Sequence, residues 1–222
     1  MKKILIAAMT IATLLVAVPQ PASAFPGGSF LITCKFVTFG QFDPLTGMTS
    51  HEHTFAGNLG VQMTSTKQQL LGQPTNCSDS RDHTAYWIPT FTKNGTKLQP
   101  YLVNAYYVGR GVNRVAFPDG YVVKSSDVRY ACSNDSGGKK VPYRCPSGGT
   151  AQFNVTFFSD QYPEVHMMFK FNVRSLVGAT ASSDMMNDPR HGDMFPAFES
   201  GHLEQLIRDC LNAHKTCGRI KG

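Results

Sequence analysis

Two short segments of the sequence combine residue types that bind metals or move protons. One residue separates His51 from His53, and His191 and Asp193 have the same spacing. Residues two apart in an extended chain point to the same side. Each pair therefore presents two side chains in one direction, and together they make a three- or four-ligand set for a divalent metal. Without a metal, the same groups could serve as acid, base and charge stabiliser.

Both segments also have a simpler interpretation. An H-x-H pair occurs by chance, and two histidines can merely hydrogen-bond a neighbouring loop. Asp193 could orient His191 or cap a turn, and Gly192 between them allows a close approach of the backbone. The sequence therefore predicts one pocket as the candidate metal or catalytic site, while a role in tying loops together stays open.

Two aromatic residues are candidates for contact with a substrate. Tyr86 and Trp87, the only tryptophan, lie in a run that continues with Ile88 and Pro89. Aromatic rings beside a polar cleft can stack on sugar rings, which would make these two residues a glycan platform. A lone tryptophan next to Ile and Pro is more often a core residue. The two interpretations differ in whether the rings are exposed.

Other classes of chemistry have no sequence signal. The chain has no Gly-x-Ser-x-Gly motif, no phosphate-binding loop and no dinucleotide fingerprint, so we expect no nucleotide or organic cofactor. The formal charge of +6 falls to +4 once Lys2 and Lys3 are removed with a signal peptide, and the remaining basic residues are scattered. This pattern argues against a nucleic-acid partner.

The N-terminal segment predicts export. A basic start, an apolar stretch from Ile4 to Val18 and the small residues Ala22–Ala24 are typical of a signal peptide over residues 1–24. No later stretch is long and apolar enough to cross a bilayer. We therefore expect a secreted or periplasmic protein whose residues 25–222 form a single domain.

All six cysteines lie in the expected mature chain, and an even number in an exported protein indicates three disulfides. The sequence alone does not fix their pairing. We expect two local loops and one longer closure, and a zinc cluster is disfavoured because no C-x-x-C occurs. The expected pairs are Cys132–Cys145, Cys210–Cys217 and Cys34–Cys77.

Strands must carry most of these residues. The segment Phe30–Phe39 alternates apolar and polar residues, and so do Ala151–Phe157 and Val165–Val173, which form a predicted hairpin. Further short strand candidates are Tyr101–Val108, Tyr121–Lys124 and Val128–Cys132.

Helix is expected in two places only. Apolar residues from Leu203 to Leu211 have helical spacing, with Ser200 placed to cap the start. A shorter helix is expected after Thr64 and Ser65, ending at Gly72. The sequence therefore predicts a mainly β fold, an antiparallel β-sandwich with short helices, a C-terminal helix among them, and disulfide-stapled loops.

The order of these motifs resembles the DUF1996 family, a secreted domain of unknown function. The resemblance covers nearly the whole mature chain and rests on segments Phe30–Cys34, Ser50–Asn58, Ser65–Thr66, Asn76–Cys77, Ala85–Pro89, Tyr106–Tyr107, Phe117–Gly120, the pair Cys132 and Cys145, His191–Asp193 and Leu203–Cys210.

The resemblance implies a site made of His51, His53, Tyr86, Trp87, His191 and Asp193. It also implies proximity to glycans or cell walls, because some fungal members carry a wall-associated WSC module. It brings no established reaction. Typical members have a longer Cys-, His- and Asp-rich loop where this chain has only Ser159–Glu164, so any function of that loop is in doubt here.

Together these observations favour an extracellular glycan-binding protein whose pocket could hold one divalent metal. An alternative is a metal-assisted polysaccharide hydrolase or lyase, in which the three histidines hold the ion and Asp193 is a fourth ligand or the base. A second alternative is a structural or adhesion protein without a metal site. A copper oxidase is less favoured, because Phe25 at the mature N-terminus provides no N-terminal histidine.

Overall fold

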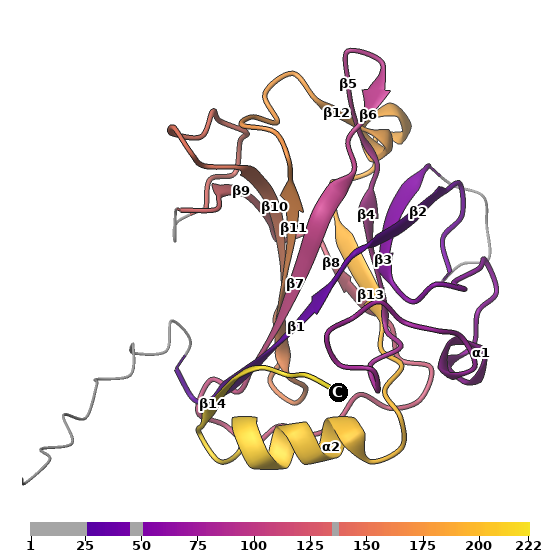
Figure 1. The fold of residues 1–222 in the computed structure, drawn as a ribbon, viewed down its shortest axis with the longest axis vertical. Helices are drawn as coiled ribbons and strands as arrows, with labels where there is room; N and C mark the ends of the chain where they lie inside the picture. The colour runs from indigo at the N-terminus through magenta and orange to yellow at the C-terminus, as the bar shows by residue number, and fades with distance from the viewer. Residues whose placement is uncertain (1–25, 45–50, 135–137) are drawn as a thin grey trace, which may run out of the picture.

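The computed structural model describes residues 26–44, 51–134 and 138–222 (Figure 1). The expected signal peptide lies outside these residues. The described chain is mainly β, with short helices and three disulfides. Its helices are too short or too polar to cross a membrane.

The larger sheet has six strands in the order β14-β1-β7-β11-β10-β9. All neighbours are antiparallel except β14 and β1, which pair in parallel. The predicted hairpin is confirmed as β10 and β11. The strands are β1 (Ser29–Cys34), β7 (Pro100–Val108), β9 (Val128–Cys132), β10 (Ala151–Phe157), β11 (Glu164–Phe171) and β14 (Thr216–Arg219).

The second sheet has five strands in the order β2-β3-β4-β13-β8, all antiparallel. A small third sheet extends the molecule beyond one end of β4 (Figure 1). The strands of the second sheet are β2 (Phe36–Gly40), β3 (His53–Gly57), β4 (Ala85–Pro89), β8 (Val123–Ser125) and β13 (Gly192–Phe195), and those of the third are β5 (Phe91–Lys93), β6 (Thr96–Lys97) and β12 (Thr180–Ala181).

The two large sheets pack face to face over an apolar core, which confirms the predicted sandwich. Alternate residues of each strand enter this core. Phe30 of β1 stacks on Tyr107 of β7 with ring centroids 4.6 Å apart, and Ile88 and Met194 approach from the second sheet. The C-terminal helix closes one end of the sandwich (Figure 1).

A second apolar cluster covers the outer face of the five-stranded sheet. Phe55, Trp87 and Phe195 project from its strands and pack against Leu70 of the helix α1 (Lys67–Leu71). Every residue of β3 and β4 is therefore buried, on one face or the other. This second layer is the setting of the candidate site.

The strands differ from the expectations in two details. The predicted strand Phe30–Phe39 is two strands, because the chain leaves the larger sheet after Cys34 and enters the second sheet at Phe36. Alternation continues across the break, so the sequence pattern does not reveal it. The predicted strand Tyr121–Lys124 lies at Val123–Ser125.

The helix ends also differ in detail. The residue that caps the start of the helix α2 (His202–Leu206) is Gly201, in a left-handed conformation and without a side-chain cap, so the expected cap by Ser200 is wrong. A π-helical turn, η2 (Ile207–Leu211), continues it. The shorter helix, α1, is capped by Thr66 in a capping box. It ends at Gly72, as predicted.

The three disulfides connect the cysteines as the sequence analysis expected. Cys34–Cys77 joins the end of β1 to the loop before β4, and the other two pairs close short loops. No free cysteine is found among the described residues.

Candidate metal centre

Strand alternation places the candidate residues on the outer face of the five-stranded sheet. His53 and Phe55 share that face of β3, and Asp193 shares that face of β13. Trp87 of the intervening strand β4 pairs with both Phe55 and Asp193. The two segments, 138 residues apart in sequence between His53 and His191, thus meet because β4 brings β3 and β13 together.

The three histidines converge. His51 precedes β3 and His191 precedes β13, and their Nε2 atoms are 3.0 Å apart. The ring centroid of His53 lies 4.4 Å from that of His51 and 5.4 Å from that of His191. One ring nitrogen from each residue lies within 4.8 Å of the other two. This is the spacing of atoms that can share one ion.

The far sides of two of the rings, those of His53 and His191, are each held by an acceptor. His53 Nδ1 lies 2.9 Å from the carbonyl oxygen of Phe42, to which it can only donate. His191 Nδ1 lies 2.9 Å from Asp193 Oδ2. Such partners fix the tautomer so that Nε2 carries the lone pair, which is how metal-ligating histidines are usually oriented.

His53 Nε2 is buried and has no hydrogen-bond partner. A buried polar atom without a partner costs about 1–3 kcal/mol. His53 is a member of the group of converging ring nitrogens, and because its Nδ1 faces the carbonyl of Phe42, Nε2 is the atom that it can offer to an ion. An ion bound there would give Nε2 the partner that it lacks.

The electrostatic setting favours the neutral form of two of the rings, those of His53 and His51. Burial, together with repulsion from the nearby His51 and His191 rings, lowers the pKa of His53 to about 3. Burial and His191 also lower the pKa of His51, while Asp188 and Asp43 act in the opposite direction. Neutral imidazole is the form that binds a metal.

Asp193 contacts the candidate centre through His191. Its carboxylate is almost fully buried and accepts from His191 Nδ1, on the side of the ring away from His51. In this position Asp193 orients the ring of His191, which is the simpler role considered in the sequence analysis. Its expected role as a fourth ligand or the base stays a prediction.

The expected sugar platform is wrong. Tyr86 and Trp87 have no exposed surface. Tyr86 points between the two sheets, where its hydroxyl lies 3.0 Å from Asp82 and 2.9 Å from the hydroxyl of Tyr107. Trp87 packs against Phe55 in the outer cluster. Neither ring can stack on a sugar, because β4 is covered on both faces.

Two contributors were missed by sequence reasoning. Asp188 Oδ2 lies 3.7 Å from His51 Nδ1 and 3.9 Å from His191 Nε2, and its side chain is 47% exposed. Its position three residues before His191 was the available signal. The carbonyl of Phe42 acts through the backbone, so no residue type could have indicated it.

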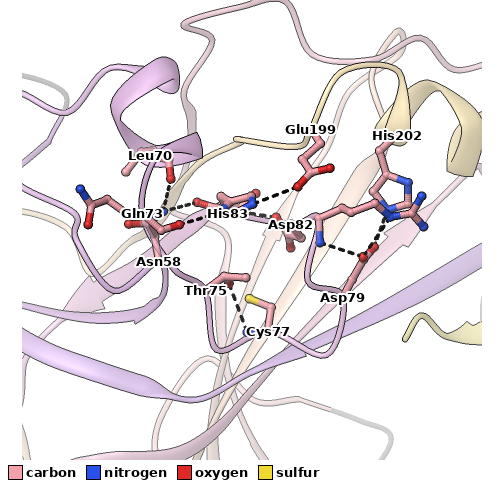
Figure 2. A network of polar contacts seen from close by, with 12 residues as sticks. Asn58, Leu70, Gln73, Thr75, Cys77, Asp79, Asp82, His83, Glu199 and His202 are labelled. Atoms are coloured by element: carbon pink, nitrogen blue, oxygen red, sulfur yellow. Dashed lines mark hydrogen bonds and ion pairs between the residues drawn. The ribbon is translucent and has the colours of Figure 1, made fainter. Parts of the chain in front are cut away.

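Two other histidines do tie loops together (Figure 2). His202 Nε2 lies 2.5 Å from Asp79 Oδ2, both side chains being buried, and His83 Nδ1 donates to the carbonyl of Gln73 at 2.7 Å. The nearby group of Cys34, Cys77 and Asp82 is not a metal site, because both sulfurs belong to a disulfide.

Comparison with known proteins gives one match. Residues 43–196, more than half of the chain, match the family model DUF1996, described as a domain of unknown function. No curated protein and no solved structure matches. The match spans all members of the histidine cluster and Asp193.

Proposed function

The chain belongs to the DUF1996 family, and we propose that it is an extracellular metal-dependent hydrolase whose centre is formed by His51, His53 and His191. The metal we propose is a divalent transition ion, with zinc as the first candidate. Three disulfides among the described residues support an oxidising compartment.

The observation that carries this proposal is the convergence of the three imidazoles, with the far sides of His53 and His191 already held by acceptors. A metal-free reading would treat the 3.0 Å contact between His51 and His191 as a hydrogen bond that ties two loops. That reading leaves His53 Nε2 buried and unpaired. A bound ion accounts for all three nitrogens at once.

The donor set favours catalysis over a purely structural ion. Structural zinc sites are usually closed by four protein ligands, whereas catalytic sites have three and keep one position for water. Zinc lowers the pKa of such a water to about 7, which yields a nucleophile near neutral pH. Asp188, partly exposed beside His51 and His191, supplies a carboxylate next to this position.

Glycan binding, the leading expectation from sequence, has lost its support from Tyr86 and Trp87. An adhesion role without a metal would need the three histidines to act as loop ties. His83 and His202 fill that role with acceptors at hydrogen-bond distance (Figure 2). His53 Nε2 has no such acceptor.

The test is the metal content of the purified protein, measured by mass spectrometry after incubation with zinc. We expect about one ion per chain, lost in the His51→Ala/His53→Ala double variant. His214→Asn is the matched control, because His214 is exposed and far from the centre in sequence. Circular dichroism of each variant checks that the fold survives.

A second measurement tests the reaction. The zinc-loaded protein should hydrolyse p-nitrophenyl acetate, lose this activity to a chelator and regain it with zinc. A protein that stays empty after incubation with zinc, copper and manganese would contradict the proposal. So would a double variant that binds as much metal as the wild type.

A further inference from the structure

A cleft adjoins the candidate centre. It has a volume of about 550 Å³, and His51 forms part of its wall. This size lies in the range of small-ligand sites. Another cavity, of about 420 Å³, lies between α1 and the start of α2 and includes none of the three histidines. The cleft beside His51 therefore adjoins the centre, and a ligand bound in it would lie next to the three histidines.

One wall of the cleft exposes two adjacent thioethers. Met185 and Met186 are 78% and 62% exposed, on the short helix η1 (Ser182–Met186). Thioether side chains are apolar and adapt to the shape of a bound apolar group. Ala181 adds a further apolar contact to this wall.

The methionine wall is held in place. Asp184 of η1 accepts from the backbone of Ala181 at 2.9 Å and from Arg190 Nε at 2.9 Å. The Arg190 guanidinium also lies over the rings of Phe91 and Tyr130. His191, one of the three proposed metal ligands, follows Arg190 directly. The same contacts therefore fix the methionine wall relative to His191.

The segment between two of the proposed metal ligands also lines the cleft. Glu52, which separates His51 from His53, forms an ion pair of 2.5 Å with Lys97. Its carbonyl oxygen accepts from Thr90 N at 2.9 Å and from the hydroxyl of Ser182. Among the described residues that line the cleft, the charged ones are Glu52 and Lys97, and they neutralise each other, so this lining favours an uncharged group.

We propose that this cleft binds the apolar acyl chain of an ester whose carbonyl lies at the three-histidine centre. The proposal rests on the hydrolase function proposed above. In the reaction, the oxygen of water bonds to the acyl carbon and the bond from that carbon to the alkoxy oxygen breaks. One proton of the water leaves with the alcohol, and the other stays with the carboxylic acid, which releases it on ionising. Water is the only co-reactant.

Binding is tested first, without any reaction. Calorimetry compares N-phenylhexanamide with N-phenylacetamide, two amides that differ only in the acyl chain. We expect the hexanamide to bind at least about tenfold more tightly, because each buried methylene contributes about 0.8 kcal/mol. The Met185→Ser/Met186→Ser variant should lose this preference. Val141→Ser is the control, since Val141 is exposed but does not line the cleft.

Enzyme kinetics then test whether a chain bound in the cleft belongs to the ester that the centre hydrolyses. With zinc-loaded protein, KM should fall at least about tenfold from p-nitrophenyl acetate to the hexanoate, a smaller gain than full burial of four methylenes would give. The double methionine variant should keep the zinc content and lose this difference in KM between the two esters.

The outcomes separate the two proposals. Equal binding of both amides overturns the acyl-chain assignment, even if zinc and acetate hydrolysis are found. Preferential binding of the hexanamide by a protein that holds no metal and hydrolyses no ester overturns the hydrolase function and the placement of the ester carbonyl, while the cleft still binds the chain.

Discussion

Asp193 acts on the candidate centre through another residue. Its buried carboxylate accepts from His191 Nδ1 at 2.9 Å. A carboxylate in this position holds the ring in one orientation and makes the opposite nitrogen a better donor to a metal. Asp193 is therefore a positioning residue, and its contribution can be measured apart from that of the ligands.

We predict that Asp193→Asn weakens zinc affinity by about 10- to 100-fold, the usual effect of losing such a partner. An amide accepts more weakly than a carboxylate, so His191 is less firmly held. Competition with a chromogenic chelator measures the affinity. Asp119→Asn, at a well exposed side chain, should leave it unchanged. Equal affinities for both variants would mean that Asp193 has no influence on the centre.

Trp87 permits a test of the core assignment. Trp87→Ala should lower the free energy of unfolding by about 3–5 kcal/mol, because the residue is fully buried in the outer cluster. Urea denaturation followed by far-UV circular dichroism measures this change. Tyr101→Ala, at a half-exposed ring, should cost much less. A small effect at Trp87 would mean that the outer cluster is not packed as described.

At the scale of residues, the sequence predicted the pairs His51/His53 and His191/Asp193, because residues two apart in an extended chain point to the same side of it. It could not predict the burial of Trp87. That burial depends on α1 and its flanking loops covering the outer face of β4, a long-range contact with no signature near the tryptophan.

The strands show where local patterns are sufficient. The hairpin β10–β11 was predictable because its two alternating runs are adjacent in sequence and paired through one short turn. The break between β1 and β2 was not, because Phe30–Phe39 keeps the same alternation while changing sheets. Which sheet a strand joins is decided by partners far along the chain, such as β7 for β1 and β3 for β2.

The ion pair between Arg190 and Asp184 clamps the short helix η1 to the segment before β13. This clamp leads to a prediction about how η1 supports the centre. Arg190→Met removes the contacts to Asp184 and should weaken zinc affinity and lower the melting temperature together, since the clamp positions His191. The Asp184 contact raises the pKa of Arg190, which stays charged. Arg208→Met is the control, because Arg208 pairs only with its neighbour Asp209 on the surface. A loss of melting temperature with full zinc affinity would restrict the clamp to stability.

At the scale of the whole molecule, the buried carboxyl of Asp82 gives a pH-dependent contribution to stability. Burial raises the pKa of Asp82 to about 6, although hydrogen bonds from Thr84 and Tyr86 oppose this effect. A raised pKa means that the folded state binds the proton more tightly than the unfolded chain. The resulting stabilisation is complete below the ordinary value of 3.8 and is lost as the pH rises through about 6.

Asp82→Asn imitates the protonated form and isolates this contribution. We expect the variant to gain stability relative to the wild type between pH 4 and pH 7, by at most about 3 kcal/mol for a shift of about two pH units. The difference must be taken at each pH, because the lowered pKa of His53 makes the wild type lose stability as the pH falls through the range below 6.5. Urea titrations at four pH values measure it. A difference that is constant with pH would contradict a raised pKa.

The parallel pairing of β14 with β1 has a practical consequence for anyone who expresses part of this chain. The matched family segment, residues 43–196, excludes both strands and also the C-terminal helix. A fragment cut at those limits would leave the β7 edge without its partner, Cys77 without Cys34, and the lower end of the sandwich uncovered. Exposed strand edges and apolar ends promote aggregation. We therefore expect inclusion bodies from such a fragment, and soluble protein from a chain that starts before Ser29 and ends after Arg219.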